Sequence, residues 1–239
     1  MIDEHETDSV GHDEIHPERE ASSLPSLPAR LVAVFVSPGR LMEQLAEEPR
    51  WLGALVVSAL LIGLSVTLIP AEVFLEVQRQ AALERGVDFP AMGDNAIQFM
   101  RVVIPVTTVL SSVIFSFVFA GIYTVIFAFV LGDEGQFKQY LAAVAHAWFI
   151  ASLFSLLLTP LRISTGDPQF TLNLASFLFF MPDGYFLNVF RVLDLSQIWS
   201  TLVIAQGAHA IDKRRSFGSA ATILLMILVA VALVLGRFL

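Results

Sequence analysis

The 239-residue chain contains no cysteine and few charged residues. Without cysteine it has no disulfide, thiolate metal site or cysteine nucleophile. Charged residues make up 15% of the chain and hydrophobic residues 56%. Average soluble proteins have roughly 25% charged and roughly 45–50% apolar residues. A soluble globule of this composition would expose too much apolar surface, and a disordered chain needs lower hydrophobicity. Composition therefore predicts an integral membrane protein.

Basic residues are also scarce, with 14 Lys and Arg against 22 Asp and Glu and a net charge of -8. Because this balance provides no basic face, we expect no nucleic-acid partner. Residues 1–20 hold eight acids and one arginine, which gives -7 and leaves 14 acids, 13 bases and a charge of -1 for residues 21–239. The acidic N-terminus lacks an apolar core, so it does not resemble a signal peptide.

Motifs of common catalytic sites are missing from the sequence. It has no phosphate-binding Gly-Lys-Ser/Thr loop, no Gly-x-Ser-x-Gly elbow and no His-Glu-x-x-His pair. Three histidines near the N-terminus, His5, His12 and His16, are irregularly spaced, so a metal-binding tail is the less favoured alternative to a solvated one. We therefore expect a protein that is not an enzyme and that holds no metal and no cofactor.

Three regions follow one another along the chain. Residues 1–28 are rich in acids, Ser and Pro and predict a disordered acidic tail. Residues 29–50 predict an interfacial amphipathic segment. In it, Ser37 can cap a helix, Pro38 suits the first helical position, and an apolar face follows, formed by Leu41, Met42 and Leu45. Residues 51–239 form the membrane domain.

The membrane domain contains five stretches of about the 20 mostly apolar residues that cross a bilayer. They are residues 52–69, 102–131, 140–161, 192–211 and 220–239. The fold class is therefore all-α, a polytopic integral membrane protein with five transmembrane helices. Residues 172–181 are apolar but too short to span, so they predict an interfacial or re-entrant piece. Residues 71–101 predict a helical hairpin outside the membrane.

The basic residues give only a weak orientation signal. With the N-terminus in the cytoplasm, eight basic residues lie inside and six outside. Most of the bias comes from Lys213-Arg214-Arg215, between the fourth and fifth spans. Because basic residues favour the cytoplasmic side, we expect the N-terminus inside and the C-terminus outside the cell membrane.

The second span carries a stripe of small side chains spaced four residues apart. Its members are Thr108, Ser112, Ser116, Ala120, Thr124 and Ala128. Helices in lipid associate through close backbone approach and interhelical hydrogen bonds, which small residues favour. The stripe predicts a packing seam inside one subunit, and the alternative is a contact with a second copy or another membrane protein.

Polar side chains at membrane depth are functional candidates because burying them in lipid is costly. The third span contributes His146, and the fourth contributes Asp194, Gln197, Gln206 and His209. Structural hydrogen bonding is the favoured interpretation. A path for a solute or protons and, more distantly, catalysis are the alternatives.

Three segments resemble the Yip family, whose Ypt-interacting-protein domain has five membrane spans. They are Ser37-Pro38-Gly39-Arg40 followed by Trp51, Gly132 to Leu141 continuing into Ala145-His146-Ala147-Trp148, and Leu193 to Trp199. The compact chain is similar to prokaryotic members. The resemblance implies a non-enzymatic integral membrane protein of the prokaryotic inner membrane. Eukaryotic relatives are linked to vesicle traffic and Rab-type GTPases through cytoplasmic N-terminal regions, which the short acidic tail does not match.

These observations favour a membrane-organising or scaffold protein that acts through helix packing and partner binding. Its expected partners are the lipid bilayer and a membrane protein or a second copy. The alternative is a small permease or accessory transporter subunit that uses polar residues of the third and fourth spans. An intramembrane enzyme is a distant third.

Overall fold

The computed structural model describes residues 24–89 and 93–239, and the regular structure in these ranges is helical. Most of the predicted acidic tail lies outside the described residues. The elements are α1 Leu27–Val36, α2 Pro38–Glu47, α3 Leu52–Leu68, α4 Ala71–Glu84, α5 Asp94–Thr124, the π-helical turn η1 Val125–Val130, α6 Phe137–Leu157, α7 Thr159–Thr165, the 3-10 turn η2 Leu174–Phe177, α8 Tyr185–Val192, α9 Leu195–Ile211 and α10 Phe217–Leu235.

Helix α6 forms the centre of the bundle and packs against α3, α5 and α9. Its residues Leu141 to Ala147 are almost completely buried, and four of these seven residues are alanine. Small side chains let neighbouring helices approach closely. On α9, a Cβ atom added to Gly207 would lie 2.7 Å from the Cβ of Ala143. Backbone proximity between α6 and α9 therefore depends on these two small residues.

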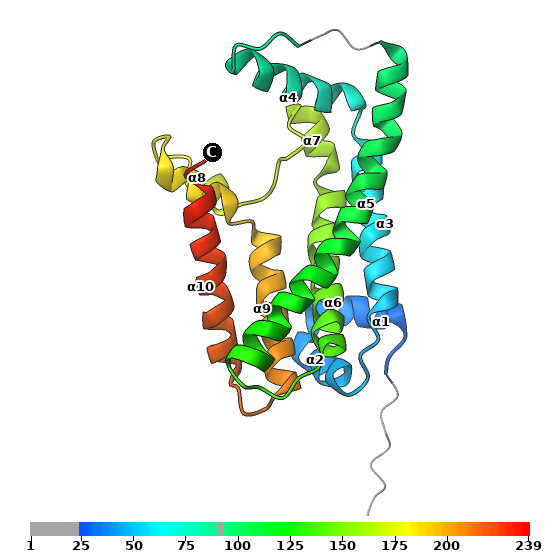
Figure 1. Ribbon diagram of the computed structural model, residues 1–239, viewed down its shortest axis with the longest axis vertical. Helices are drawn as coiled ribbons and strands as arrows, with labels where there is room; N and C mark the ends of the chain where they lie inside the picture. Colours follow the sequence, from blue (N-terminus) through cyan, green and yellow to red (C-terminus); the bar gives the residue numbers. More distant parts are fainter. Residues whose placement is uncertain (1–23, 90–92) are drawn as a thin grey trace, which may run out of the picture.

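The bundle has two distinct ends (Figure 1). Helices α1 and α2, the α5–α6 loop and the α9–α10 turn lie at one end, here named the α2 end. Helices α4 and α8 lie at the opposite end, here named the α4 end, where the chain also terminates. The described part of the chain begins near α1 at the α2 end and terminates toward the α4 end.

Among the described residues, three helical segments are long and apolar enough to cross a membrane: the continuous α5–η1 helix, α6 and α10. A fourth is obtained if α3 and α4, which meet at an angle of 76°, count as one bent span. Helices α3 and α9 have 17 residues each and are slightly short of the usual length. The five predicted stretches thus coincide with five helices, and the number that crosses the bilayer stays a prediction.

Several predicted boundaries differ from the structure. Helix α1 starts at Leu27, so the folded part begins within the predicted tail. The segment 29–50 forms two helices, and Ser37 between them makes no side-chain cap hydrogen bond. The predicted third span 140–161 is divided, because α6 ends at Leu157 and α7, with Pro160 in its first turn, begins at Thr159. The second arm of the predicted hairpin is the start of α5, since Asp94 to Arg101 continue directly into that helix.

The short apolar piece 172–181 contains only the turn η2 and no longer helix. Its aromatic side chains face outward, and Phe179 is 92% exposed. Asn173 pairs with Asp194 across an isolated antiparallel bridge, which attaches this segment to the start of α9. The segment is therefore tied to the start of α9 while its aromatic side chains stay exposed.

Candidate functional site

The α5–α6 loop and the α9–α10 turn are joined by an ion pair at the α2 end. The Arg215 guanidinium donates to both carboxylate oxygens of Asp133, with 2.6 Å between Nη2 and Oδ1. The Arg215 and Asp133 side chains are only 14% and 7% exposed. Bidentate charge-assisted hydrogen bonds are strong, and this one raises the pKa of Arg215. The pair therefore fastens two segments that are 82 residues apart in sequence.

Two aromatic rings lie beside this ion pair. The guanidinium carbon of Arg215 is 5.7 Å from the ring centroid of Phe127, which belongs to η1. The Phe127 ring in turn stacks on Tyr140 of α6, with the two planes inclined by only 7°. Both rings are at most 1% exposed. A cation over a desolvated aromatic face gains about 2 kcal/mol, so the rings reinforce the position of Arg215.

Two glycines of the α5–α6 loop are required by its geometry. Gly132 follows Leu131, the C-cap of η1, and has φ +72°, a left-handed conformation that glycine adopts without steric cost. Gly135 lies against α6 and the end of α9. A Cβ atom at Gly135 would lie 2.8 Å from the Tyr140 hydroxyl and 2.9 Å from Cγ2 of Ile211. Both glycines belong to the segment that resembles the Yip family.

Asp212, directly after α9, binds the same loop from the other side. Its carboxylate accepts hydrogen bonds from the backbone N–H of Glu134 at 2.8 Å and of Arg214 at 2.9 Å. The Arg214 guanidinium donates to it as well, with Nη2 at 2.7 Å from Oδ2. The Arg214 hydrogen bond, followed by the two N–H groups, holds the pKa of the Asp212 carboxyl well below its usual range. The basic turn is therefore matched by nearby acids.

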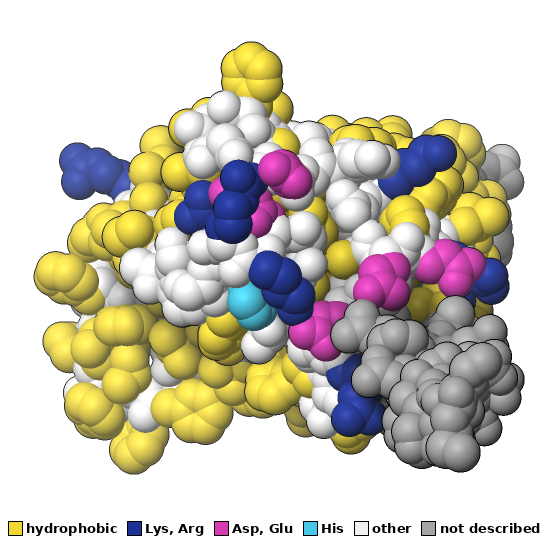
Figure 2. Space-filling model, turned by 90° about the horizontal axis from the view of Figure 1, so that it is seen from below, with side chains coloured by type: hydrophobic (Ala, Val, Ile, Leu, Met, Phe, Trp, Pro, Cys, Tyr) yellow, Lys and Arg dark blue, Asp and Glu magenta, His cyan; other side chains and the backbone are white. Residues whose placement is uncertain are grey.

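Helix α2 is held under the bundle by apolar and polar contacts. Leu41, Met42 and Leu45 are each 1% exposed. Gln139 of α6 donates to the carbonyl of Ala46 at 2.7 Å, and Lys213 binds Glu43 at 2.6 Å. Figure 2 shows the α2 end, where Lys, Arg, Asp and Glu side chains gather near the middle of the face and hydrophobic side chains occupy one flank. We call this set of contacts between the loop, the turn and α2 the polar junction.

Two of the predicted polar candidates, Asp194 and Gln197, lie at the α4 end of α9. Asp194 is the N-cap of this helix and accepts from the backbone N–H groups of Ser196 and Gln197 and from the Ser196 hydroxyl. Such caps satisfy N–H groups that have no partner within the helix. The side chain of Gln197 is exposed. The geometry thus gives Asp194 a capping position.

Gln206 and His209 lie at the other end of α9, next to the polar junction. A ring nitrogen of His209, Nδ1, is 2.6 Å from the carbonyl oxygen of Arg215, so His209 contacts the basic turn. Gln206 lies beside the start of α2, where its Oε1 would be 3.6 Å from a Cβ atom on Gly39. Twelve residues separate Asp194 from Gln206, which is about 18 Å along a helix. These candidates therefore belong to two separate places.

His146 is completely buried in α6. Its Nδ1 lies 2.8 Å from the carbonyl oxygen of Ala142, and since a carbonyl only accepts, Nδ1 carries the proton. Its Nε2 is buried without a hydrogen-bond partner among the described residues.

Arg30 of α1 is 6% exposed and donates from Nη1 to the carbonyl of Arg50, while its Nε has no partner in the described part of the chain. Burial lowers the pKa of Arg30.

The small-residue stripe of α5 turns toward the rest of the bundle at its centre. Ser116 and Ala120 are 1% and 0% exposed, and the other four members are half-buried. The hydroxyls of Thr108, Ser112, Ser116 and Thr124 all donate to carbonyls of the preceding turn of α5 itself. No hydroxyl of the stripe bonds another helix within the described residues, so its contacts are close packing.

A second polar cluster lies between α3, α6 and α7. Arg162 is 9% exposed and donates to the hydroxyl of Ser155 at 2.7 Å and to the carbonyl of Phe170 at 3.0 Å. The Ser65 hydroxyl joins it, with Oγ 2.9 Å from the Thr159 hydroxyl oxygen. These hydroxyls and carbonyls solvate the buried cation. In the sequence, Arg162 is only a basic residue that directly follows the predicted third span, 140–161.

The polar junction was missed as a site because its acids and bases were treated separately. In the sequence, Lys213-Arg214-Arg215 indicates only an orientation, and the Gly132–Tyr140 stretch indicates only the family resemblance. An available signal was the presence of Asp133 in the one segment and Asp212 beside the other. Pairing them, however, requires knowing that the two segments meet.

The fold and its apolar helices define the class of protein: a helical membrane protein. The Yip1 domain model matches residues 32–236. The chain therefore belongs to the Yip1 domain family, as its motifs predicted. No curated protein and no solved structure matches it.

Proposed function

We propose that this protein is a non-enzymatic membrane-organising or scaffold protein whose polar junction presents a preformed surface to a partner. The supporting observation is that ion pairs and hydrogen bonds hold the α5–α6 loop, the α9–α10 turn and α2 together. They are formed by Asp133–Arg215, Asp212 and Lys213–Glu43. A surface held in this way binds without the entropy cost of ordering loops. The Yip1 family is not known as an enzyme family, which fits a binding role.

The arrangement of the polar candidates favours this function over a permease. A path for a solute or protons needs polar groups that follow one another across the membrane. Asp194 caps one end of α9, His209 contacts the turn at its other end, and His146 is buried in α6 without a hydrogen bond to either in the described structure. The polar side chains thus hold local structure in three places. The ion flux into proteoliposomes should therefore be the same for the wild type and for His146→Ala.

The proposed topology has five spans, α3, α5, α6, α9 and α10, in the cell membrane. The N-terminus and the polar junction then face the cytoplasm, and the C-terminus lies outside. Because the chain has no cysteine, single substitutions report accessibility without background. Lys213→Cys should react with a membrane-impermeant maleimide only after the cells are opened, whereas Glu76→Cys should react in intact cells. The reverse pattern would invert the topology.

Photo-crosslinking in native membranes tests the scaffold function. A photoreactive residue at Lys138, which is exposed beside the polar junction, should give one adduct of defined mass, either with a second copy or with a single partner. The same residue at Glu84, exposed on α4, is the control and should give none. Glu134→Lys should abolish the Lys138 adduct because it reverses a side-chain charge that is 88% exposed at the junction.

The absence of any adduct with the photoreactive residue at Lys138 would contradict the scaffold function. Equal adducts at both positions would also contradict it, because they would report random collision in the membrane. Folding of each variant is checked by its helical circular dichroism and its thermal unfolding.

A further inference from the structure

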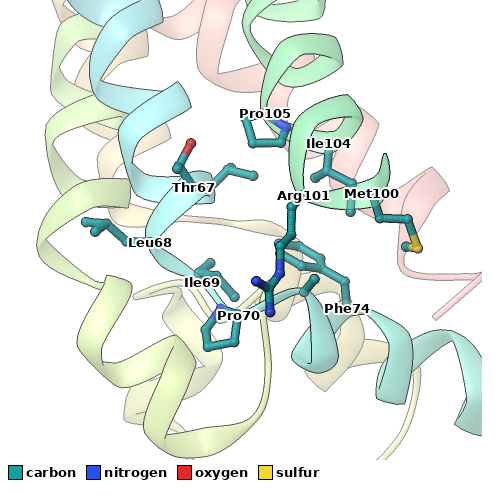
Figure 3. A pocket seen from close by; sticks show the side chains of 11 residues that line it. Thr67, Leu68, Ile69, Pro70, Phe74, Met100, Arg101, Ile104 and Pro105 are labelled. Atoms are coloured by element: carbon teal, nitrogen blue, oxygen red, sulfur yellow. The ribbon is translucent and has the colours of Figure 1, made fainter. Parts of the chain in front are cut away.

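A cavity lies at the elbow between α3 and α4, where both helices face α5 (Figure 3). Its volume of about 370 Å³ falls within the range of about 300–1,000 Å³ found for small-molecule sites. The lining comes from the end of α3, the link to α4 and one face of α5. Its members are Val66, Thr67, Leu68, Ile69, Pro70, Ala71, Phe74, Met100, Arg101, Ile104 and Pro105.

Two prolines explain why the helices do not close on one another here. Pro70 lies in the link between the helices, and α4 leaves at 76° to α3. On the facing helix, Pro105 lies inside α5 and has no N–H to donate to the carbonyl of Arg101. The cavity is therefore built into the backbone, and its rim contains a carbonyl without its usual helical donor.

In the proposed topology, the cavity lies at the depth where acyl chains meet lipid headgroups. Helix α3 has 17 residues and rises about 25 Å from the α2 end, close to the roughly 30 Å thickness of the hydrocarbon core. Large apolar side chains are exposed along this helix up to its end, as in Leu60, Leu64 and Leu68. Charged side chains begin immediately beyond, with Glu72 on α4 and Arg101 on α5.

One cation and one anion lie beside this apolar cavity. Arg101 Nη2 donates to Glu72 Oε1 at 2.9 Å, and the two side chains are 50% and 57% exposed. Figure 3 shows the Arg101 side chain extending from α5 toward Pro70 and Phe74. An exposed ion pair contributes only about 0–1 kcal/mol, so a ligand that offers both charges can replace it at little cost.

We propose that this elbow binds one zwitterionic phospholipid of the adjacent leaflet. Its acyl chain enters the apolar cavity, its phosphate binds Arg101, and its ammonium group binds Glu72. The apolar lining accounts for the chain, and the paired charges account for a headgroup with both signs. This site is independent of the polar junction at the other end of the bundle.

Native mass spectrometry of the full chain tests the proposal. The protein is delipidated in mild detergent and mixed with equal amounts of phosphatidylethanolamine, which is zwitterionic, and phosphatidylglycerol, which is anionic. The wild type should retain one phosphatidylethanolamine per chain. Arg101→Gln and Glu72→Gln should each weaken this binding about tenfold, the effect of losing one charge-assisted contact.

A matched control is available on α4, the helix that carries Glu72. Arg79→Gln breaks the ion pair with Glu76, whose N–O distance is 2.8 Å and whose side chains are similarly exposed, but neither residue lines the cavity. It should leave lipid retention unchanged. Ile104→Trp keeps the Arg101–Glu72 pair but fills the cavity, and it should reduce retention.

Two results would overturn the proposal. Preferential retention of phosphatidylglycerol, unchanged by Glu72→Gln, would assign the site to an anionic headgroup. Equal retention in wild type, Arg101→Gln and Ile104→Trp would show nonspecific lipid. If Arg101→Gln does not fold, the competition between the two lipids for the wild-type protein still shows whether the site selects the zwitterionic headgroup.

Discussion

Replacing Asp133 with asparagine should destabilise the protein far more than breaking any exposed ion pair. The substitution leaves the Arg215 guanidinium, whose side chain is 14% exposed, without its carboxylate. Removing one partner of a buried ion pair costs about 3–5 kcal/mol. Arg215 keeps its contact with the Phe127 ring and a 3.3 Å hydrogen bond to Ser219, so we expect about 3 kcal/mol, the lower end of this range.

Thermal unfolding in detergent, followed by the fluorescence of the three tryptophans, measures this effect. For a chain of this size, 1 kcal/mol shifts Tm by about 2–4 °C, so Asp133→Asn should lower Tm by about 6–12 °C. The matched control is Glu43→Gln at the same end of the bundle. It breaks the Lys213–Glu43 pair, whose side chains are 58% and 56% exposed, and should lower Tm by less than about 4 °C.

A double variant separates the ion pair from other effects of the substitution. Asp133→Asn combined with Arg215→Gln removes both charges and should cost less than the sum of the single substitutions. If Asp133→Asn shifts Tm no more than Glu43→Gln does, the pair does not hold the α5–α6 loop to the α9–α10 turn.

Three further substitutions test other contacts. The pKa of Asp212 is lowered on folding, so its contribution to stability is full above the ordinary Asp value of about 4 and is lost as the pH falls through the lowered pKa. Between pH 6 and pH 3, the Tm of Asp212→Asn should therefore fall less steeply than the Tm of the wild type. An unchanged slope would contradict this. Gly135→Ala should lower Tm because its Cβ would lie within 2.9 Å of two side chains, whereas Gly218→Ala, with nothing within 4 Å, should not; equal Tm values for the two variants would refute the close approach. Arg30 is buried without a carboxylate within 4 Å among the described residues. In denaturant titration, Arg30→Met should therefore lower the free energy of unfolding by less than about 1.5 kcal/mol, or raise it. A loss of unfolding free energy comparable to that of Asp133→Asn would show that the charge of Arg30 is needed.

The helices were predictable because a bilayer imposes a local requirement on sequence. Each crossing needs a run of apolar residues of fixed length, and such runs are visible without knowledge of any contact. The predicted stretches 102–131 and 220–239 therefore coincide with most of α5–η1, residues 94–130, and of α10, residues 217–235. The α2 helix was predictable for a similar reason, because its apolar face repeats at helical spacing.

Boundaries were less predictable where packing replaces lipid. Helix α6 ends at Leu157 and α7 begins at Thr159, where Arg162 donates to the Ser155 hydroxyl and the Thr159 hydroxyl donates to the Ser155 carbonyl. No single residue in this stretch signals a break at Leu158. The break was not apparent because a proline at the first turn of a helix and a proline after its end look alike in sequence.

The sequence by itself determined the environment of this protein, its helical class and its family. Those properties depend on composition and on motifs of neighbouring residues. Only the tertiary structure decided that the basic turn is neutralised by Asp133 and Asp212, and that an ion pair lies beside a cavity at the α3–α4 elbow. The physical reason is that ion pairs and cavities depend on where distant segments meet. Arg215 and Asp133 are 82 residues apart, and their attraction becomes significant only when folding brings them together and removes water.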